Sequence, residues 1–288
     1  MNISTSSLLL SIANLRSQTL TSLMDRGTGD SSSFDSILSQ IQAGSDTAST
    51  TAPATTNGRN TTLRDPESAY AMMTEINRRD VAYKAQYAEL GQMRSYLPQE
   101  QEAAQQLNAL EGTDDAATIK AKLQDFAEKY NAWVDRFGPD VEKGGVLSGT
   151  QAAEVPLYEL EQVVKNPFLG AMDGFRGLKD LGISIDPQTD RMTLDTATLD
   201  AALASNKQGA VNTLDDFSEN FASSAKLFAS DGNFISNRLA NLGGAISYIN
   251  SNVAAWRQEF GSGDSGDKVK PKELVANALN AYNGAFGL

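Results

Sequence analysis

The chain has 288 residues, none of them cysteine or histidine, and its 36 acidic against 24 basic side chains give a net charge of −12 at pH 7. Without these two residue types it cannot form disulfides, zinc sites built on thiolate or imidazole, or catalytic triads that need an imidazole base. The net charge disfavours nucleic-acid binding, and no apolar run near the start approaches the roughly 18 residues of a membrane span. We therefore expect no cofactor, no nucleic-acid partner and no membrane insertion.

The first 42 residues hold two amphipathic stretches, the second of them over residues 34–41. The first stretch carries leucine and isoleucine at near-helical spacing, at Leu8, Ile12, Leu15, Leu20 and Leu23. Stripes this short are marginal as isolated helices in water, so we expect order only where they pack against a surface. Residues 43–63 are mainly Ala, Ser, Thr, Gly and Asn, and this composition predicts a flexible linker.

A helical rod domain is predicted over residues 64–260. Asp65 as N-cap and Pro66 as first helical residue indicate where its first long helix begins. Pro98 is expected to break or kink this helix, because proline lacks the backbone N–H that a helix interior uses.

The strongest helical pattern comes next, capped by Thr113 or Asp114 and ending at Gly138–Pro139. Its apolar residues alternate at spacings of four and three, as in the seam between packed helices. They are Ile119, Leu123, Phe126, Tyr130, Trp133 and Phe137. We interpret the four aromatic side chains among them as packed core rather than as a sugar-binding platform. Helices with such seams should form an antiparallel bundle.

The periodicity then changes from helical to alternating. The alternation of Ile183 with Ile185 and of Met192 with Leu194, around a Pro-Gln-Thr-Asp turn, predicts a small β-hairpin near residues 183–195. The hairpin is expected to lead directly into another helix.

Asp195 is expected to cap that helix, and further helices are predicted over 214–230 and 234–260. A segment rich in Gly, Ser and Asp at 261–270 predicts a second linker. The last helix lies within 271–288, and its apolar stripe is Val275, Leu279, Tyr282 and Phe286. Because the N-terminal and C-terminal stripes both lie beyond linkers, we predict that they contact other subunits or a partner.

No arrangement of residues points to catalysis. Asp186, Asp190 and Asp195 surround the predicted turn, but they lack the spacing of a calcium-binding loop and are equally well explained as turn and cap residues. Residues 263–266 read Gly-Asp-Ser-Gly, like a protease nucleophile segment, yet without histidine we interpret them as linker. Glycoside hydrolysis needs only two carboxylates, and none of the 36 acidic residues stands out as a pair. The sequence therefore predicts no enzyme and no metal.

Several segments resemble, in order and spacing, the C-terminal half of the flagellar filament cap family, also called flagellar hook-associated protein 2. The matching residues are Phe126, Tyr130 and Asn131 in a helix, Leu181, Gly182 and Ile183 in a strand, Leu194 and Asp195 in the next strand, and Leu199 and Leu203 in a helix. Residues 145–149 and 231–246 are similar to two further family segments. The similarity covers residues 119–260.

The resemblance implies a mainly α fold, an elongated antiparallel helical bundle or coiled-coil-like rod with one small β-hairpin, flanked by terminal helices on linkers. It also implies a structural, self-assembling component of the bacterial flagellum, exported by the flagellar type III route without a cleaved signal peptide and located outside the cell at the filament tip. The implied partners are other copies of the chain, flagellin or hook–filament junction proteins, and an export chaperone. The sequence is a reduced form, because residues 43–63 stand where the family carries β-rich outer domains.

Two other hypotheses stay open. A secreted or export-associated binding module, such as an adaptor or adhesin, would use the helical rod to hold a partner helix and would remain monomeric alone. A hydrolase that relies on carboxylates would need a tuned acidic pair, which the sequence does not identify.

Overall fold

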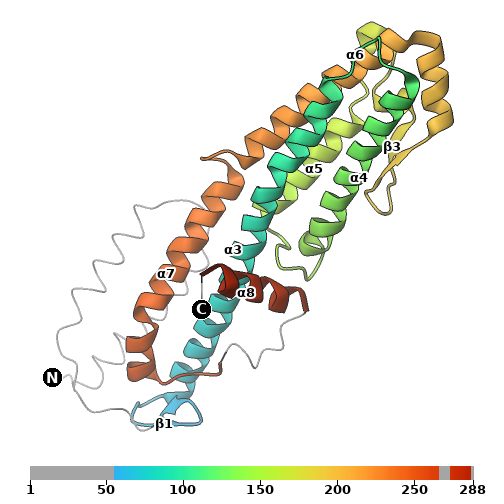
Figure 1. Cartoon of the computed structure of the whole chain (residues 1–288). Helices are drawn as coiled ribbons and strands as arrows, with labels where there is room; N and C mark the ends of the chain where they lie inside the picture. The colour runs from blue at the N-terminus through green and yellow to red at the C-terminus, as the bar shows by residue number, and fades with distance from the viewer. Residues whose placement is uncertain (1–54, 266–272, 287–288) are drawn as a thin grey trace, which may run out of the picture. The chain divides into compact units, whose positions relative to one another are not determined.

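The computed structural model of this protein describes residues 55–265 and 273–286 (Figure 1). These residues are mainly helical and divide into two compact units. The first unit contains residues 55–81 and 244–265, and the second contains 82–243 and 273–286. Two long helices, α3 (Pro66–Asn108) and α7 (Phe234–Phe260), contribute to both units. The mainly α fold with a small hairpin, expected from the sequence, is confirmed.

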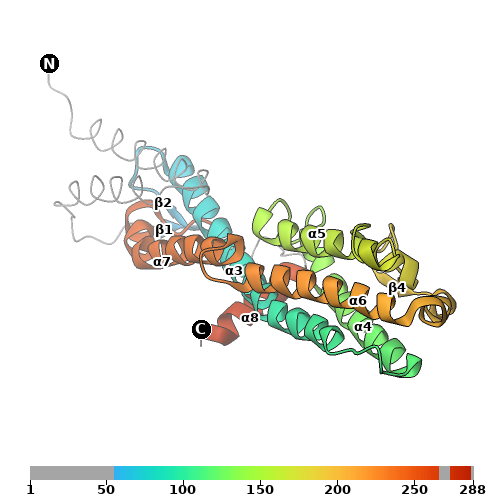
Figure 2. The ribbon, with the colours of Figure 1, turned by 90° about the horizontal axis from the view of Figure 1, so that it is seen from above.

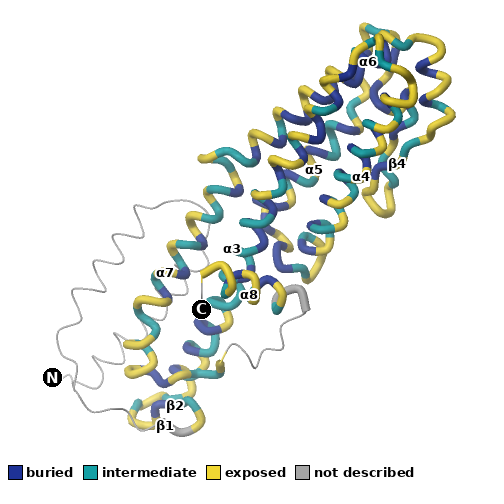
Figure 3. The backbone as a smooth tube through the Cα atoms, in the orientation of Figure 1, coloured by how far each residue is buried: buried dark blue, intermediate teal, exposed yellow. Residues whose placement is uncertain are grey.

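In the first unit, residues of α3 and α7 bury a shared apolar seam (Figure 3). Its buried members on α3 recur at spacings of four and three, and the first two on α7 are three residues apart, as in a coiled coil. They are Ala69, Met73 and Ile76 on α3, and Ile246, Ile249 and Phe260 on α7. In this unit, both helices therefore bury apolar side chains.

A hairpin of β1 (Thr55–Thr56) and β2 (Arg59–Asn60) lies in the segment predicted as a linker. Its turn residues Asn57 and Gly58 have φ values of 50° and 81°, the left-handed pair that a two-residue hairpin turn requires. The Asn60 side-chain amide donates to the Glu259 carbonyl at 2.9 Å, which ties the hairpin to the end of α7.

The start of the second predicted linker is also held in the first unit. The Asn77 side-chain amide donates to the carbonyls of Ser262 and Asp264, at 2.9 and 2.7 Å. The Asp264 N–H donates to the Thr74 hydroxyl at 2.9 Å. The backbone at the start of the Gly-Asp-Ser-Gly segment is thus hydrogen-bonded to side chains of α3.

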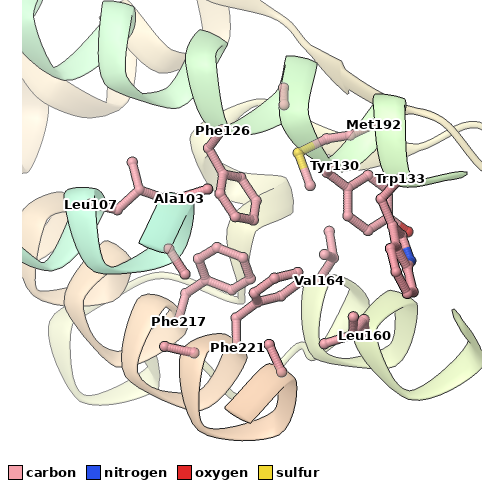
Figure 4. Packing of buried hydrophobic residues seen from close by; sticks show 14 of the residues in the cluster. Ala103, Leu107, Phe126, Tyr130, Trp133, Leu160, Val164, Met192, Phe217 and Phe221 are labelled. Carbon is pink, nitrogen blue, oxygen red and sulfur yellow. The ribbon is translucent and has the colours of Figure 1, made fainter. Parts of the chain in front are cut away.

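The second unit is a helical bundle of α3 with α4 (Ala116–Val141), α5 (Gln151–Lys165) and α6 (Thr196–Ala229), arranged as Figures 1 and 2 show. Aromatic rings fill its centre (Figure 4). Phe126 of α4 meets Phe217 and Phe221 of α6 edge to face, at centroid distances of 5.3 and 5.1 Å. The four aromatic side chains of the α4 stripe are fully buried, so their interpretation as core is confirmed.

Helix ends differ from the sequence predictions at the prolines. α3 is continuous through Pro98, so this proline does not break the helix, while the alternative of a kink stays a prediction. α4 continues past Pro139 to Val141, and the predicted stop there is wrong. The extra turn is held by Asp140, which is buried and whose carbonyl accepts the Leu147 N–H at 2.8 Å.

The N-cap of α4 is Asp115 rather than Thr113 or Asp114, and its carboxylate accepts the Thr118 N–H at 2.7 Å. The predicted cap was therefore wrong by one residue. Asp114 instead accepts the Glu111 N–H at 2.7 Å, in the turn that precedes the helix. Of the two adjacent aspartates, Asp114 therefore holds the preceding turn and Asp115 caps the helix.

α6 contains a kink at Asn206, where φ is −155° and ψ is 76°. The Asn206 side-chain oxygen accepts the Gly209 N–H at 3.0 Å, and its amide donates to the Asp173 carbonyl at 2.9 Å. The kink separates a short helix after Asp195 from a longer one, as predicted, although the longer one begins well before residue 214.

None of the helices within 55–265 and 273–286 has an apolar stretch of the length that a bilayer requires.

Candidate functional site

The residues that carry the family resemblance meet at a hairpin between α4 and α6, which we call the hairpin junction. Its strands β3 (Ile183–Ile185) and β4 (Met192–Leu194) pair antiparallel, with Ile183 opposite Leu194. The 3-10 turn η2 (Leu178–Leu181) leads into β3. At the tip, the Asp186 carboxylate accepts the N–H groups of Gln188 and Thr189, at 2.8 and 3.0 Å, so the predicted hairpin is confirmed.

Asn131 of α4 joins the helix to the hairpin. Its side-chain amide donates to the Met192 carbonyl at 3.0 Å, and its side-chain oxygen accepts the Met192 N–H at 2.7 Å. The amide thus satisfies both backbone groups of one strand residue, as a neighbouring strand would. Asparagine suits this place because it combines a donor and an acceptor on one short side chain.

Replacing Asn131 with alanine should lower the free energy of unfolding by about 2 kcal/mol, because it leaves two backbone groups of a buried strand without partners. Asn220→Ala is the matched control, since Asn220 is an exposed helical asparagine that bonds only its own helix at Asp216. Urea unfolding of both variants measures the difference, and the Met192 amide should exchange with deuterium faster only in the first. Equal stability of the two variants would contradict the stabilising role of the hydrogen bonds between Asn131 and Met192.

Gly182 and Asp195 close the base of the hairpin. The Asp195 N–H donates to the Gly182 carbonyl at 2.8 Å, while its carboxylate accepts the N–H groups of Ala197 and Thr198 as N-cap of α6. Gly182 has φ of +80°, and a Cβ added there would lie 2.3 Å from the Asp195 carbonyl oxygen. These hydrogen bonds lower the pKa of Asp195, the bond from the Thr198 hydroxyl most of all, so the cap stays charged.

The apolar members of the junction join the core of the second unit. Leu181, Ile183, Leu199 and Leu203 are buried, and Leu194 packs against them half-buried. Phe126 and Tyr130 belong to the same buried cluster. The structure therefore places these apolar residues of the family motifs in one buried cluster with the core of the second unit.

The acidic residues at the hairpin serve the fold. Asp186 holds the tip and Asp195 caps α6, as described above, while Asp190 adopts a left-handed φ of 54° in the turn. Among the residues that the structure describes, no group of three or more His, Cys, Asp or Glu side chains is arranged to hold a metal ion.

A group of buried charges between α3 and α4 was missed by sequence reasoning. Arg136 donates to Glu89, to Gln92 at 2.6 Å and to Asp140 at 3.1 Å. The side chains of Glu89 and Asp140 are 5% and 2% exposed, whereas that of Arg136 is 31% exposed. Burial, with the nearby Asp140 charge, raises the pKa of Glu89. Only the i, i+4 spacing of Arg136 and Asp140 signalled any part of this group.

The loop between α5 and η2 displays two large apolar side chains. Phe168 is 80% exposed and Met172 is 99% exposed. Asp173 anchors the loop on α6, because its carbonyl accepts from Asn206 at 2.9 Å and its carboxylate accepts from Asn212 at 2.7 Å. A fixed loop that holds apolar side chains in water is typical of an interaction surface.

The predicted subunit contacts fall in two places. Leu8, Ile12, Leu15, Leu20 and Leu23 lie outside the described residues, as do the 1–42 segment and most of the first linker. Val275 lies in the helix α8 (Glu273–Phe286). In the same helix, Leu279 is half-buried, Tyr282 is buried in the second unit and Phe286 is 53% exposed. Their roles between subunits stay predictions.

A family model described as flagellar hook-associated protein 2 C-terminus matches residues 97–260, more than half of the chain. The match begins near the end of α3, includes the whole hairpin junction and the Phe168 loop, and ends with α7. Neither a curated protein nor a solved structure matches the chain.

Proposed function

We propose that this chain, which belongs to the flagellar hook-associated protein 2 family, is a self-assembling component of the flagellum that acts at the filament tip by packing helices between subunits. The family membership over residues 97–260 carries the proposal and supports a structural role related to the filament cap. The same membership speaks against catalysis, because this is a family of structural proteins.

The surface of the described residues offers support for assembly. When a neighbouring subunit covers exposed apolar side chains, the burial is favourable by about 25 cal/mol per Å2 of apolar surface removed from water. Those exposed by half or more are Tyr158, Phe168, Met172, Leu227, Phe234 and Phe286. Other copies of the chain are the proposed first partner, with flagellin or hook–filament junction proteins as further partners.

The proposed route to this place is export through the flagellar type III apparatus, with an export chaperone before secretion. A chain without cysteine suits that route, because no disulfide can form before or after passage. The protein is then expected in sheared filaments rather than in the cell body.

Deleting the gene should give short or missing filaments and release flagellin into the medium, which electron microscopy and immunoblotting of the supernatant measure. Complementation with Phe168→Ser/Met172→Ser should restore less filament than the wild type, because the double variant removes exposed apolar contacts without touching the core. Ala171→Ser, an exposed substitution between them, is the matched control. Normal filaments in the deletion strain would remove the role at the filament tip.

The alternative binding module predicts a different behaviour in solution. Sedimentation of the full chain over a range of concentrations should show association for a self-assembling subunit. A monomer at every concentration that binds one partner in equal proportion would instead favour the adaptor or adhesin.

A further inference from the structure

In the second unit, α8 lies beside α3 (Figure 1). The two helices meet through a small aromatic cluster. The ring of Tyr282 lies edge-on to that of Tyr87 at a centroid distance of 6.0 Å, and the Phe286 ring lies 5.9 Å from Tyr87. The Lys84 ammonium sits over the Tyr282 ring at 6.0 Å. We call the surface formed by Lys84 and Tyr87 the α8 site.

The contact that holds α8 is small. Among its described side chains α8 buries Ala278 and Tyr282, whereas α4 buries eight residues. α8 has 14 residues, near the length at which an isolated helix is marginal in water, so it owes its order to docking. Elements with few buried contacts open at a much lower free energy than the core does. α8 should therefore leave the α8 site far more often than the bundle unfolds.

We propose that subunits exchange α8, so that the helix released from one copy docks on the α8 site of a second copy. The proposal rests on the self-assembly proposed above. The partner follows from the contact itself: the aromatic face of α8 fits this site within one chain, and every copy carries both the helix and the site. Exchange of an identical element between copies needs no new interface.

The protein concentration decides whether α8 docks on its own chain or on a second copy. Docking within one chain has a fixed effective concentration, whereas docking on a second copy gains as subunits crowd together. A released α8 exposes Tyr282 as well as Phe286 to water, which favours capture by whichever site is nearest. Exchange would thus be rare in dilute protein and frequent in an assembly.

The absence of cysteine makes a clean cross-linking test. Full-length Lys84→Cys is mixed with a size-tagged full-length Asn283→Cys, and a short bismaleimide is added. Lys84→Cys removes the ammonium that sits over the Tyr282 ring, whereas Tyr87, Tyr282 and Phe286, the aromatic part of the contact, stay in place. The control pair joins Lys84→Cys with Gln188→Cys, an exposed position at the hairpin tip. Exchange predicts cross-linked heterodimers that increase with concentration in the first pair and not in the control.

Adding Tyr282→Ala to the Asn283→Cys chain should lower the heterodimer yield by about tenfold, since the variant loses the buried ring of the contact. As a measurement without substitutions, hydrogen exchange in α8 of the wild-type chain should change with protein concentration. Suppose that the wild type associates in sedimentation, that hydrogen exchange in α8 is independent of protein concentration, and that the first pair yields no more heterodimer than the control pair. The exchange of α8 between subunits is then overturned, and self-assembly stands. If the wild type never associates, both proposals fail.

Discussion

Replacing Glu100 with glutamine should raise the free energy of unfolding by about 3 kcal/mol at pH 8 and leave it unchanged near pH 4. Glu100 lies on α3, is 2% exposed, and has one carboxyl oxygen buried without a hydrogen-bond partner. Burial raises the pKa of this carboxyl from 4.5 to about 7, against a smaller opposing effect of Lys129. The difference of between two and three pKa units corresponds to about 3 kcal/mol.

The sign follows from proton binding. Between pH 4.5 and 7 the folded chain keeps the Glu100 proton that the unfolded chain has lost, so stability falls as pH rises through this window. Glutamine does not titrate, so the variant should not lose stability as the pH rises. Urea unfolding of wild type and variant from pH 4 to 8 measures it, with Glu102→Gln, an exposed neighbour on the same helix, as control. Parallel curves for all three proteins would show that Glu100 is solvated.

Gly182→Ala should destabilise the second unit by about 3 kcal/mol, whereas Gly174→Ala should cost about 1 kcal/mol. Both glycines have left-handed φ values, +80° and +90°, so an alanine is strained at either. They differ in space: a Cβ at Gly182 would lie 2.3 Å from the Asp195 carbonyl oxygen, while a Cβ at Gly174 has nothing within 4 Å.

The larger effect at Gly182 comes from the cap of α6. Moving Asp195 away from an alanine breaks its backbone bond to residue 182 and displaces the carboxylate from the first turn of the helix. Thermal unfolding of the two variants compares the costs directly, and hydrogen exchange at Ala197 and Thr198 reports on the cap. Similar melting temperatures for the two variants would mean that the backbone at Asp195 shifts to accommodate the alanine without lowering the stability.

Local signals predicted the hairpin and the start of α6 because the interactions behind them are short in sequence. Asp195 caps residues two and three positions ahead, and the alternation of Ile183 with Ile185 needs only a pleated strand. The α4 stripe predicted a buried face for the same reason, since helical spacing alone decides which side chains share a face.

Contacts that helix and turn propensities do not consider explain the errors. Pro139 does not end α4, because Asp140 is held by Arg136 and by the Leu147 N–H, neither of which propensity alone considers. The buried carboxyls of Glu89 and Glu100 gave no warning, since acidic residues on a helix are normally solvated. The first linker hides a hairpin for a similar reason: Asn60 is tied to Glu259, far away in the chain.

The sequence by itself determined the helical class, the hairpin, the cysteine-free chemistry and the family motifs, because each depends on residue type or on spacings within a few positions. Only the tertiary structure decided that Asn131 clamps Met192, that two glutamates are buried on α3, and that α8 rests on Tyr87. Those facts depend on which helices meet and in what register. Burial and hydrogen-bond partners are properties of pairs of segments, and a single chain read in order does not contain them.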